Sequence, residues 1–322
     1  MWTATPYADQ RVPVPPGSVP HLPPKRPFRV VAGVDWSRDS LAAVREVAAL
    51  YAIDDLTLVH ALPLGGLRPR LCTERVKSRS HLSADSHRHE SVAAARRDLA
   101  WVAALIQKKV GSTREVCRSG VPAGIMLDTA RTVGAALIVV GQRGTREHLD
   151  RSMGSVSREI CLEAACSTLV VRKPLGIAGR VLALIRQADD VALLQRWLRT
   201  FPFKEPTHLT VLCLIPGSQR GDPIGPLSVR FWRDAAMHNA RSLLEPMVRE
   251  IEGPSLRVTT RILQGDPSRI VLQEALNCDL FIVHGSDRKG RDPMRCGSPW
   301  RALLNLAPCS TLVLRGGEDG WT

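Results

Sequence analysis

The sequence predicts an α/β fold made of two tandem domains, each with an open and mostly parallel sheet. From Phe28 onward, short aliphatic runs alternate with longer amphipathic stretches, a pattern typical of consecutive β-α-β units. The order of these runs occurs twice along the chain. The length of 322 residues also exceeds a single domain of roughly 100–200 residues. Together these observations favour a duplicated α/β domain.

The elements of the first half follow from its apolar runs. The short runs rich in valine, leucine and isoleucine have the composition of strands buried on both faces. The stretches between them carry apolar residues at helical spacing, and a polar insertion precedes the second helix. The expected strands are 29–35, 56–62, 113–117, 136–141 and 168–172, and the expected helices are 39–51, 91–110, 123–133 and 155–164.

The second half repeats the same order of elements. Its expected strands are 180–185, 209–214, 256–262, 280–284 and 311–315, and its expected helices are 191–198, 231–251, 268–277 and 300–306. Three segments also match as sequence: Gly120–Ala123 with Gly265–Ser268, Leu137–Gly141 with Leu280–Gly285 after a shift of one residue, and Ala165–Arg172 with Pro308–Arg315. A period of about 145 residues indicates a domain duplication and is too long for a solenoid.

Composition sets the limits of the domains. Residues 1–27 are rich in proline and poor in aliphatic residues, so we expect a disordered arm there. We expect the two domains at 28–175 and 179–317, followed by a short tail at 318–322. The chain as a whole is 44% hydrophobic and 23% charged, which excludes wholesale disorder.

The charge balance raises the question of an anionic partner. The chain has 44 lysines and arginines against 31 acidic residues, a formal net charge of +13. The basic insertion at residues 63–90 contains no phenylalanine, tyrosine or tryptophan, so it lacks the stacking surfaces that bind single-stranded nucleic acids. We therefore do not expect nucleic-acid binding as the main function, and a weak, nonspecific form of it remains one alternative.

Cysteine usage and hydropathy bear on the compartment. The eight cysteines include no Cys-x-x-Cys pair, which favours reduced, packed thiols over a disulfide scaffold or a zinc site. No apolar run reaches the ~20 residues that a membrane-spanning helix needs. We expect a cytoplasmic protein without a membrane partner.

A glycine-rich segment follows the strand expected at 136–141. Gly141 and Gly144 are followed, nine residues later, by Gly154 and Ser155 at the start of a helix. Glycine lets the backbone approach a ligand closely, and the amides at a helix N-terminus attract phosphate. Because open α/β sheets bind ligands at the carboxyl ends of their strands, this segment predicts a phosphate-binding loop.

The spacing Gly-x2-Gly-x9-Gly-Ser resembles the nucleotide-binding signature of universal stress proteins. Three further segments agree with that family in order and spacing: Val34–Ser37, Gly120–Pro122 and Cys166–Arg172. The resemblance covers about 28–174 closely and 179–317 more loosely. The chain is therefore similar to a tandem universal stress protein, and the resemblance implies two Rossmann-like domains of the adenine nucleotide alpha hydrolase-like type.

The resemblance also implies ATP or a related adenine nucleotide as the ligand of the first domain, with Mg²⁺ as a possible companion held by phosphates and water. It places adenine and ribose near the Asp35 carboxylate and, less firmly, against Val59. It places the phosphates along the glycine loop and the helix start. The implied binding residues are Asp35, Val59, Gly141, Gly144, Gly154, Ser155, Val156 and Ser157.

The second domain departs from this pattern. Alignment of the two first strands puts Arg186 where Asp35 stands, and the glycines of the second loop, beginning at Gly285, have a different spacing. We expect this domain to be a structural partner that does not hold ATP as the first does. In the family, paired domains associate through their last strands, which implies a pseudo-dimer within this chain; a homodimer of the whole chain stays open.

Several kinds of chemistry have no motif here. The sequence lacks a Gly-x4-Gly-Lys-Ser/Thr loop, a Gly-x-Gly-x-x-Gly fingerprint and a Gly-x-Ser-x-Gly elbow. His81, His87 and His89 lack the ligand spacing of a metal site, so we expect neither metal ligands nor catalytic residues, and at most slow, incidental ATP hydrolysis. The leading hypothesis is a regulatory nucleotide-binding protein, and the alternative of the same fold is a nucleotide-free scaffold.

Overall fold

The structure is a computed structural model that describes residues 27–62, 84–144, 153–172, 179–215, 226–285 and 299–316. The first half begins with the alternation of strand and helix that its apolar runs predict. Its strands are β1 (Arg29–Gly33), β2 (Ile53–Leu62), β3 (Val110–Ser119), β4 (Leu137–Gly141) and β5 (Ser167–Val171), and its helices are α1 (Arg38–Leu50), α2 (Ala84–Ile106), α3 (Pro122–Val133) and α4 (Ser155–Glu163).

The second half repeats these elements in the same order. Its strands are β6 (Arg180–Ile185), β7 (Thr207–Ile215), β8 (Leu256–Gln264), β9 (Leu280–His284) and β10 (Ser310–Leu314), and its helices are α5 (Ala188–Thr200), α6 (Pro226–Ile251), α7 (Pro267–Ala275) and α8 (Pro299–Leu306). The predicted α/β class is confirmed, and so is the largely parallel sheet.

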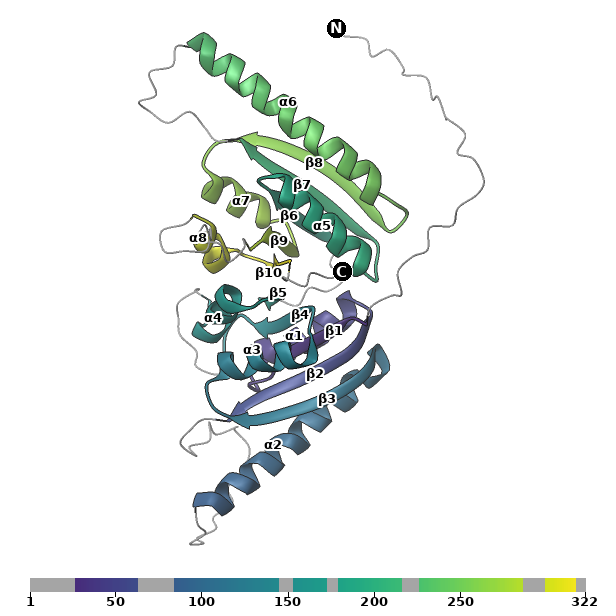
Figure 1. Ribbon diagram of the computed structural model, residues 1–322, viewed down its shortest axis with the longest axis vertical. Coiled ribbons are helices and arrows are strands. Elements are labelled where there is room, and N and C mark those ends of the chain that lie inside the picture. The colour runs from purple at the N-terminus through teal and green to yellow at the C-terminus, as the bar shows by residue number, and fades with distance from the viewer. Residues whose placement is uncertain are drawn as a thin grey trace, which may run out of the picture.

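The strands of both halves form one ten-stranded sheet in the order β3-β2-β1-β4-β5-β10-β9-β6-β7-β8 (Figure 1). Neighbours within each half are parallel. At the centre, β5 and β10 pair antiparallel, with Leu169 opposite Leu312. The last strands of the two halves thus join them edge to edge, which is the pairing that the family resemblance implies.

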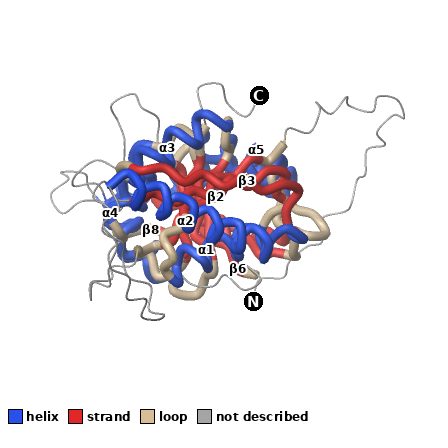
Figure 2. Tube along the Cα trace, turned by 90° about the horizontal axis from the view of Figure 1, so that it is seen from below, coloured by secondary structure: helices blue, strands red, loops and turns tan. Residues whose placement is uncertain are grey.

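Helices cover both faces of this sheet, as the view along the long axis shows (Figure 2). Side chains of a strand alternate between faces, and in β1 Val30 and Ala32 enter one apolar layer while Val31 enters the other. One layer includes residues of α1, α2, α5 and α6, and the other includes residues of α3, α4, α7 and α8. Each layer therefore runs through both halves of the molecule.

An aromatic cluster also joins the halves on the side of α1 and α5. Phe28 stacks on Phe201 with ring centroids 3.9 Å apart, and Tyr51 stacks on Phe203 at 5.6 Å. The Trp197 indole donates a hydrogen bond to the Tyr51 hydroxyl at 3.2 Å. Since Phe28 and Tyr51 come from the first half and the others from the second, this cluster adds a second interface to the strand pair.

The strand boundaries differ from the sequence expectation mainly at the edge of the sheet. β2 begins at Ile53, three residues earlier than expected, because its polar start is bonded to neighbours: the Asp54 carboxylate accepts the Phe28 amide at 2.6 Å, and Asp55 accepts the Ser112 hydroxyl. β3 runs from Val110 to Ser119 rather than over 113–117. As an edge strand with mostly exposed side chains, β3 shows little of the apolar pattern from which strands are recognised.

Candidate functional site

The candidate site lies where the path of the chain through the sheet reverses. From β1 the chain continues to β2 and β3 on one side, and it then returns to β4 and β5 on the other side of β1. Parallel α/β sheets bind ligands at such a switch point, outside the carboxyl ends of the two strands. Asp35 follows β1 and the glycine loop follows β4, so the structure brings these two predicted parts together.

The Asp35 carboxylate is held in place by the turn into α1. Its Oδ1 atom accepts the Ser37 amide at 3.0 Å and the Ser37 hydroxyl at 2.6 Å. Ser37 is the N-cap of α1 and accepts the Ser40 amide at 3.1 Å. Between them, Trp36 has a φ of 67°, a left-handed conformation that is strained for a bulky residue and typical of functional turns.

Each glycine of the loop permits a close approach of backbone. A Cβ atom on Gly141 would lie 2.6 Å from the Asp39 carbonyl carbon, and one on Gly154 would lie 3.1 Å from the Gln142 carbonyl oxygen. A Cβ atom on Gly144 would lie 2.7 Å from Oδ2 of Asp35. The loop therefore passes directly over the Asp35 carboxylate, and any side chain at residue 144 would displace either the loop or this carboxylate.

The N-terminus of α4 adjoins this loop. The Gly154 amide donates to the Gln142 carbonyl at 2.9 Å, and the buried Ser157 hydroxyl donates to the Gly141 carbonyl at 2.7 Å. No side chain caps the helix, so in the described structure the first-turn amides of Ser155, Val156 and Ser157 have no intrahelical acceptor. These amides, rather than the Ser157 hydroxyl, are the groups that an anion can reach.

Comparison with known proteins agrees with this geometry. The sequence model of the universal stress protein family matches residues 28–172. The first half of the chain belongs to the universal stress protein family. A comparison with curated proteins found no significant match.

Solved structures of universal stress proteins share the fold of the whole chain. The protein from Archaeoglobus fulgidus DSM 4304 is 15% identical, with a TM-score of 0.56 over 90% of this chain and 97% of that one. A putative universal stress protein from Pseudomonas aeruginosa UCBPP-PA14 is 14% identical, with a TM-score of 0.57 over 91% of this chain and 94% of that one. At these identities the likeness shows the fold alone, and it extends to the second half.

Two consecutive residues of β2 lie beside the turn after β1: Val59, which the sequence offered as a candidate, and His60, which it did not. Val59 of β2 is a buried part of an apolar layer, and its carbonyl accepts the Val34 amide at 2.8 Å. The next residue, His60, bonds through Nδ1 to the Val34 carbonyl at 2.6 Å, and its ring lies 5.4 Å from that of Trp36. The Ser37-x-x-Ser40 pattern was a detectable cap signal, whereas nothing local in the sequence indicates the Trp36–His60 contact.

The register of the strands identifies the residues of the second half that correspond to the candidate site of the first half. Val30 of β1 pairs with Leu137 of β4, and Val181 of β6 pairs with Leu280 of β9. The equivalent pairs are therefore Asp35 and Arg186, Asp39 and Asp190, and Gly141 and His284. The equivalence of Asp35 and Arg186 agrees with the sequence alignment, whereas the one-residue shift expected in the fourth strand is wrong, because His284 and not Gly285 stands opposite Gly141.

These second-half residues form a compact hydrogen-bonded network. The Asp190 side chain, 1% exposed, accepts the Arg186 Nε at 3.0 Å and the His284 Nδ1 at 2.5 Å. Arg186 also donates through Nη2 to the His284 carbonyl at 3.0 Å. Burial disfavours the charged carboxylate, but the hydrogen bonds from His284 and Arg186 outweigh it and hold the pKa of Asp190 below its usual range.

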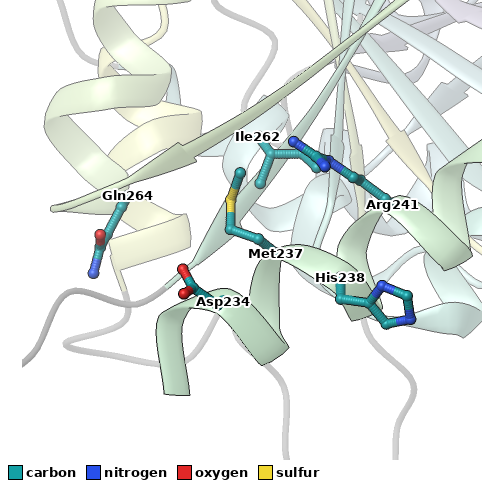
Figure 3. A pocket seen from close by; sticks show the side chains of 6 residues that line it. All are labelled: Asp234, Met237, His238, Arg241, Ile262 and Gln264. Carbon is teal, nitrogen blue, oxygen red and sulfur yellow. The ribbon is translucent and has the colours of Figure 1, made fainter. Parts of the chain in front are cut away.

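A cavity of about 620 Å³ lies elsewhere, between α6 and the edge strand β8 (Figure 3). Asp234, His238 and Arg241 line it from one face of α6, and Gln264 lines it from β8. It is remote from the switch points in the strand order and contains no glycine loop, so we place the candidate site at β1 and β4 instead. The cavity is an open groove under an exposed helix.

The described residues contain neither a metal site nor a membrane-spanning helix. Within those ranges, no three histidine, cysteine or acidic side chains lie together as a metal site requires. Likewise, no helix in the described part combines the length and apolar character needed to cross a bilayer. The side chains of His81, His87 and His89, the basic insertion up to residue 83, and the second glycine loop beyond Gly285 lie outside the described residues.

Proposed function

We propose that this chain is a regulatory protein of the universal stress type that binds ATP, or a related adenine nucleotide, in its first half. One observation carries the proposal: a fixed carboxylate, a glycine loop and the open amides of a helix N-terminus converge at the switch point of the sheet. The Asp35 carboxylate, Gly144 and the start of α4 supply these three parts.

Each part suits one portion of a nucleotide. A carboxylate accepts hydrogen bonds from a ribose hydroxyl or an adenine amine, and the Ser37 bonds leave Oδ2 of Asp35 facing the loop. The glycines allow phosphates to approach the backbone, and the amides of α4 attract their charge. Val59 would lie at the adenine end, and Mg²⁺, if it accompanies the nucleotide, would be held mainly by phosphates and water.

The second half has a different role in this proposal. An arginine replaces the carboxylate and is already paired with Asp190, so the half serves as a structural partner for the first. We assign no catalytic residue in either half. The proposed activity is regulatory: nucleotide occupancy changes the conformation or the assembly of the two-domain unit.

The test is the ligand content of the purified full-length protein. Denaturing the protein and separating the supernatant by chromatography with mass detection should give about one adenine nucleotide per chain. Gly144→Glu should abolish this content, because the side chain would enter the space of the Asp35 carboxylate. Arg186→Ala, at the second-half equivalent of Asp35, should retain it.

The opposite outcome would also be informative. If the wild-type protein contains no adenine nucleotide and calorimetry detects no binding of added ATP, the proposal is wrong. The alternative of a nucleotide-free scaffold with the same fold would then be favoured.

A further inference from the structure

Two arginines cross between the halves directly after the central strands. Arg315 follows β10 and donates through Nη2 to the Cys161 carbonyl at 2.7 Å and the Leu162 carbonyl at 3.3 Å, both in the last turn of α4. Arg172 follows β5 and donates to the carbonyls of Leu304 and Asn305 at the end of α8. Each arginine thus binds the C-terminus of the last helix of the opposite half.

The backbone amides of the two arginines also form matching hydrogen bonds across the halves. The Arg315 amide donates to the Ser167 hydroxyl at 3.1 Å, and the Arg172 amide donates to the Ser310 hydroxyl at 3.1 Å. Arg315 is 7% exposed, and burial lowers the pKa of Arg172 to about 10, which leaves it charged at neutral pH. The two arginines are therefore structurally matched and differ in the helix that each one holds.

Helix α4 ends without a left-handed cap residue. Its C-cap, Ala164, is extended and donates only its own amide, to the Ile160 carbonyl, and the last turn of the helix contains no basic residue. Unpaired carbonyls at a helix C-terminus need donors, and a cation there also complements the helix dipole. Arg315 meets both needs from the other half of the chain.

The opposite end of α4 is the phosphate end of the proposed nucleotide site. A nine-residue helix is only about 13 Å long, so the orientation set at one end is transmitted to the other. At the N-terminus, the Ser157 hydroxyl and the Gly154 amide tie α4 to the loop after β4. The two ends of the helix are thus fixed by different halves.

We propose that Arg315 is a positioning residue for the phosphate-binding end of the first-half site. The proposal rests on the nucleotide function proposed above, and it gives the second half a direct part in that function. Arg315 holds the C-terminus of α4, and the helix in turn aims the amides of Ser155, Val156 and Ser157 at the phosphates. Arg172 does the same for α8, where Arg186 and His284 occupy the equivalent of the site.

The experiment compares ATP with adenosine on three forms of the full chain by calorimetry. Arg315→Ala should weaken ATP binding about tenfold, equivalent to ~1.4 kcal/mol, and should change adenosine binding less than about twofold, because adenosine has no phosphate at α4. Arg172→Ala, the matched control, should change both affinities less than about twofold. Arg315→Lys keeps the charge and one donor direction, and it should recover most of the loss.

The outcomes separate the two proposals. Failure of the wild type to bind ATP overturns the nucleotide function. Wild-type binding with equal effects of Arg315→Ala and Arg172→Ala, or with ATP and adenosine weakened alike, overturns the positioning role of Arg315 alone. If either alanine variant does not fold, Arg315→Gln and Arg172→Gln, which keep a hydrogen-bond donor without the charge, give the same comparison.

Discussion

The two halves share a scaffold and differ at the carboxyl ends of their central strands. Both have the same order of strands and helices, yet Asp35, Asp39 and Gly141 of the first half correspond to Arg186, Asp190 and His284 of the second. In the first half a side chain at 141 would collide with α1, and in the second half the equivalent side chain bonds to α5. The fold therefore depends on the apolar layers, and the proposed nucleotide site depends on a few positions at the carboxyl ends of the strands.

The largest expected effect is on stability in the second half. Asp190→Ala should lower the free energy of unfolding by about 3–5 kcal/mol, because it leaves the guanidinium of Arg186 without its buried carboxylate. Asp39→Ala, the equivalent change, should cost only about 0.5–1.5 kcal/mol, because Asp39 accepts one backbone amide, that of Arg143 at 3.3 Å, and complements the start of α1. Urea denaturation of both variants measures the difference, and equal losses would contradict the contrast between the halves.

The next effect is on nucleotide binding in the first half. Asp35→Ala should weaken ATP binding by about 10–100-fold, as loss of a charged hydrogen bond worth roughly 1.5–3 kcal/mol predicts. Arg186→Ala should leave the affinity unchanged. Titration calorimetry on the full chain gives both values, and a loss of affinity in the Arg186 variant would mean that the second half contacts the ligand.

A smaller effect concerns pH. The hydrogen bonds from His284 and Arg186 hold the folded pKa of Asp190 below its unfolded value, which is about 3.9. Asp190 therefore stabilises the protein above about pH 4, and this contribution is lost as the pH falls through the folded pKa. Melting temperatures between pH 6 and pH 2.5 should fall more steeply for the wild type than for Asp190→Asn, and parallel curves would exclude the effect.

The smallest effect concerns the reactivity of buried thiols, which should be equally low in the two halves. Burial raises the pKa of Cys161, Cys166 and Cys309 to about 12, so these thiols are protonated and unreactive at neutral pH. A disulfide reagent at pH 8, followed by peptide mapping, should label all three only after denaturation. Rapid labelling of Cys309 alone would show that the second half is less well packed than the first.

Much of the fold was predictable because strands buried on both faces leave continuous apolar runs. β6 and β9 have the expected boundaries. β2 starts earlier than expected because its polar first residues are hydrogen-bonded to neighbours, and β3 is longer than expected because an edge strand carries polar residues. Of the candidate site, the glycine spacing predicted the loop, and the position of Asp35 after β1 predicted its place. The Trp36–His60 contact and the Asp190–His284 hydrogen bond could not be predicted, since each joins residues that are distant in sequence.

The shared apolar layers also bear on how the chain folds. Because each layer takes side chains from both halves, a separated half would expose a strand edge at β5 or β10 and one side of the aromatic cluster. The protein should consequently unfold in a single cooperative transition, and limited proteolysis should not release a stable half. The second half is thus needed for its packing and for Arg315, which leaves the residues at the carboxyl ends of its central strands free to diverge.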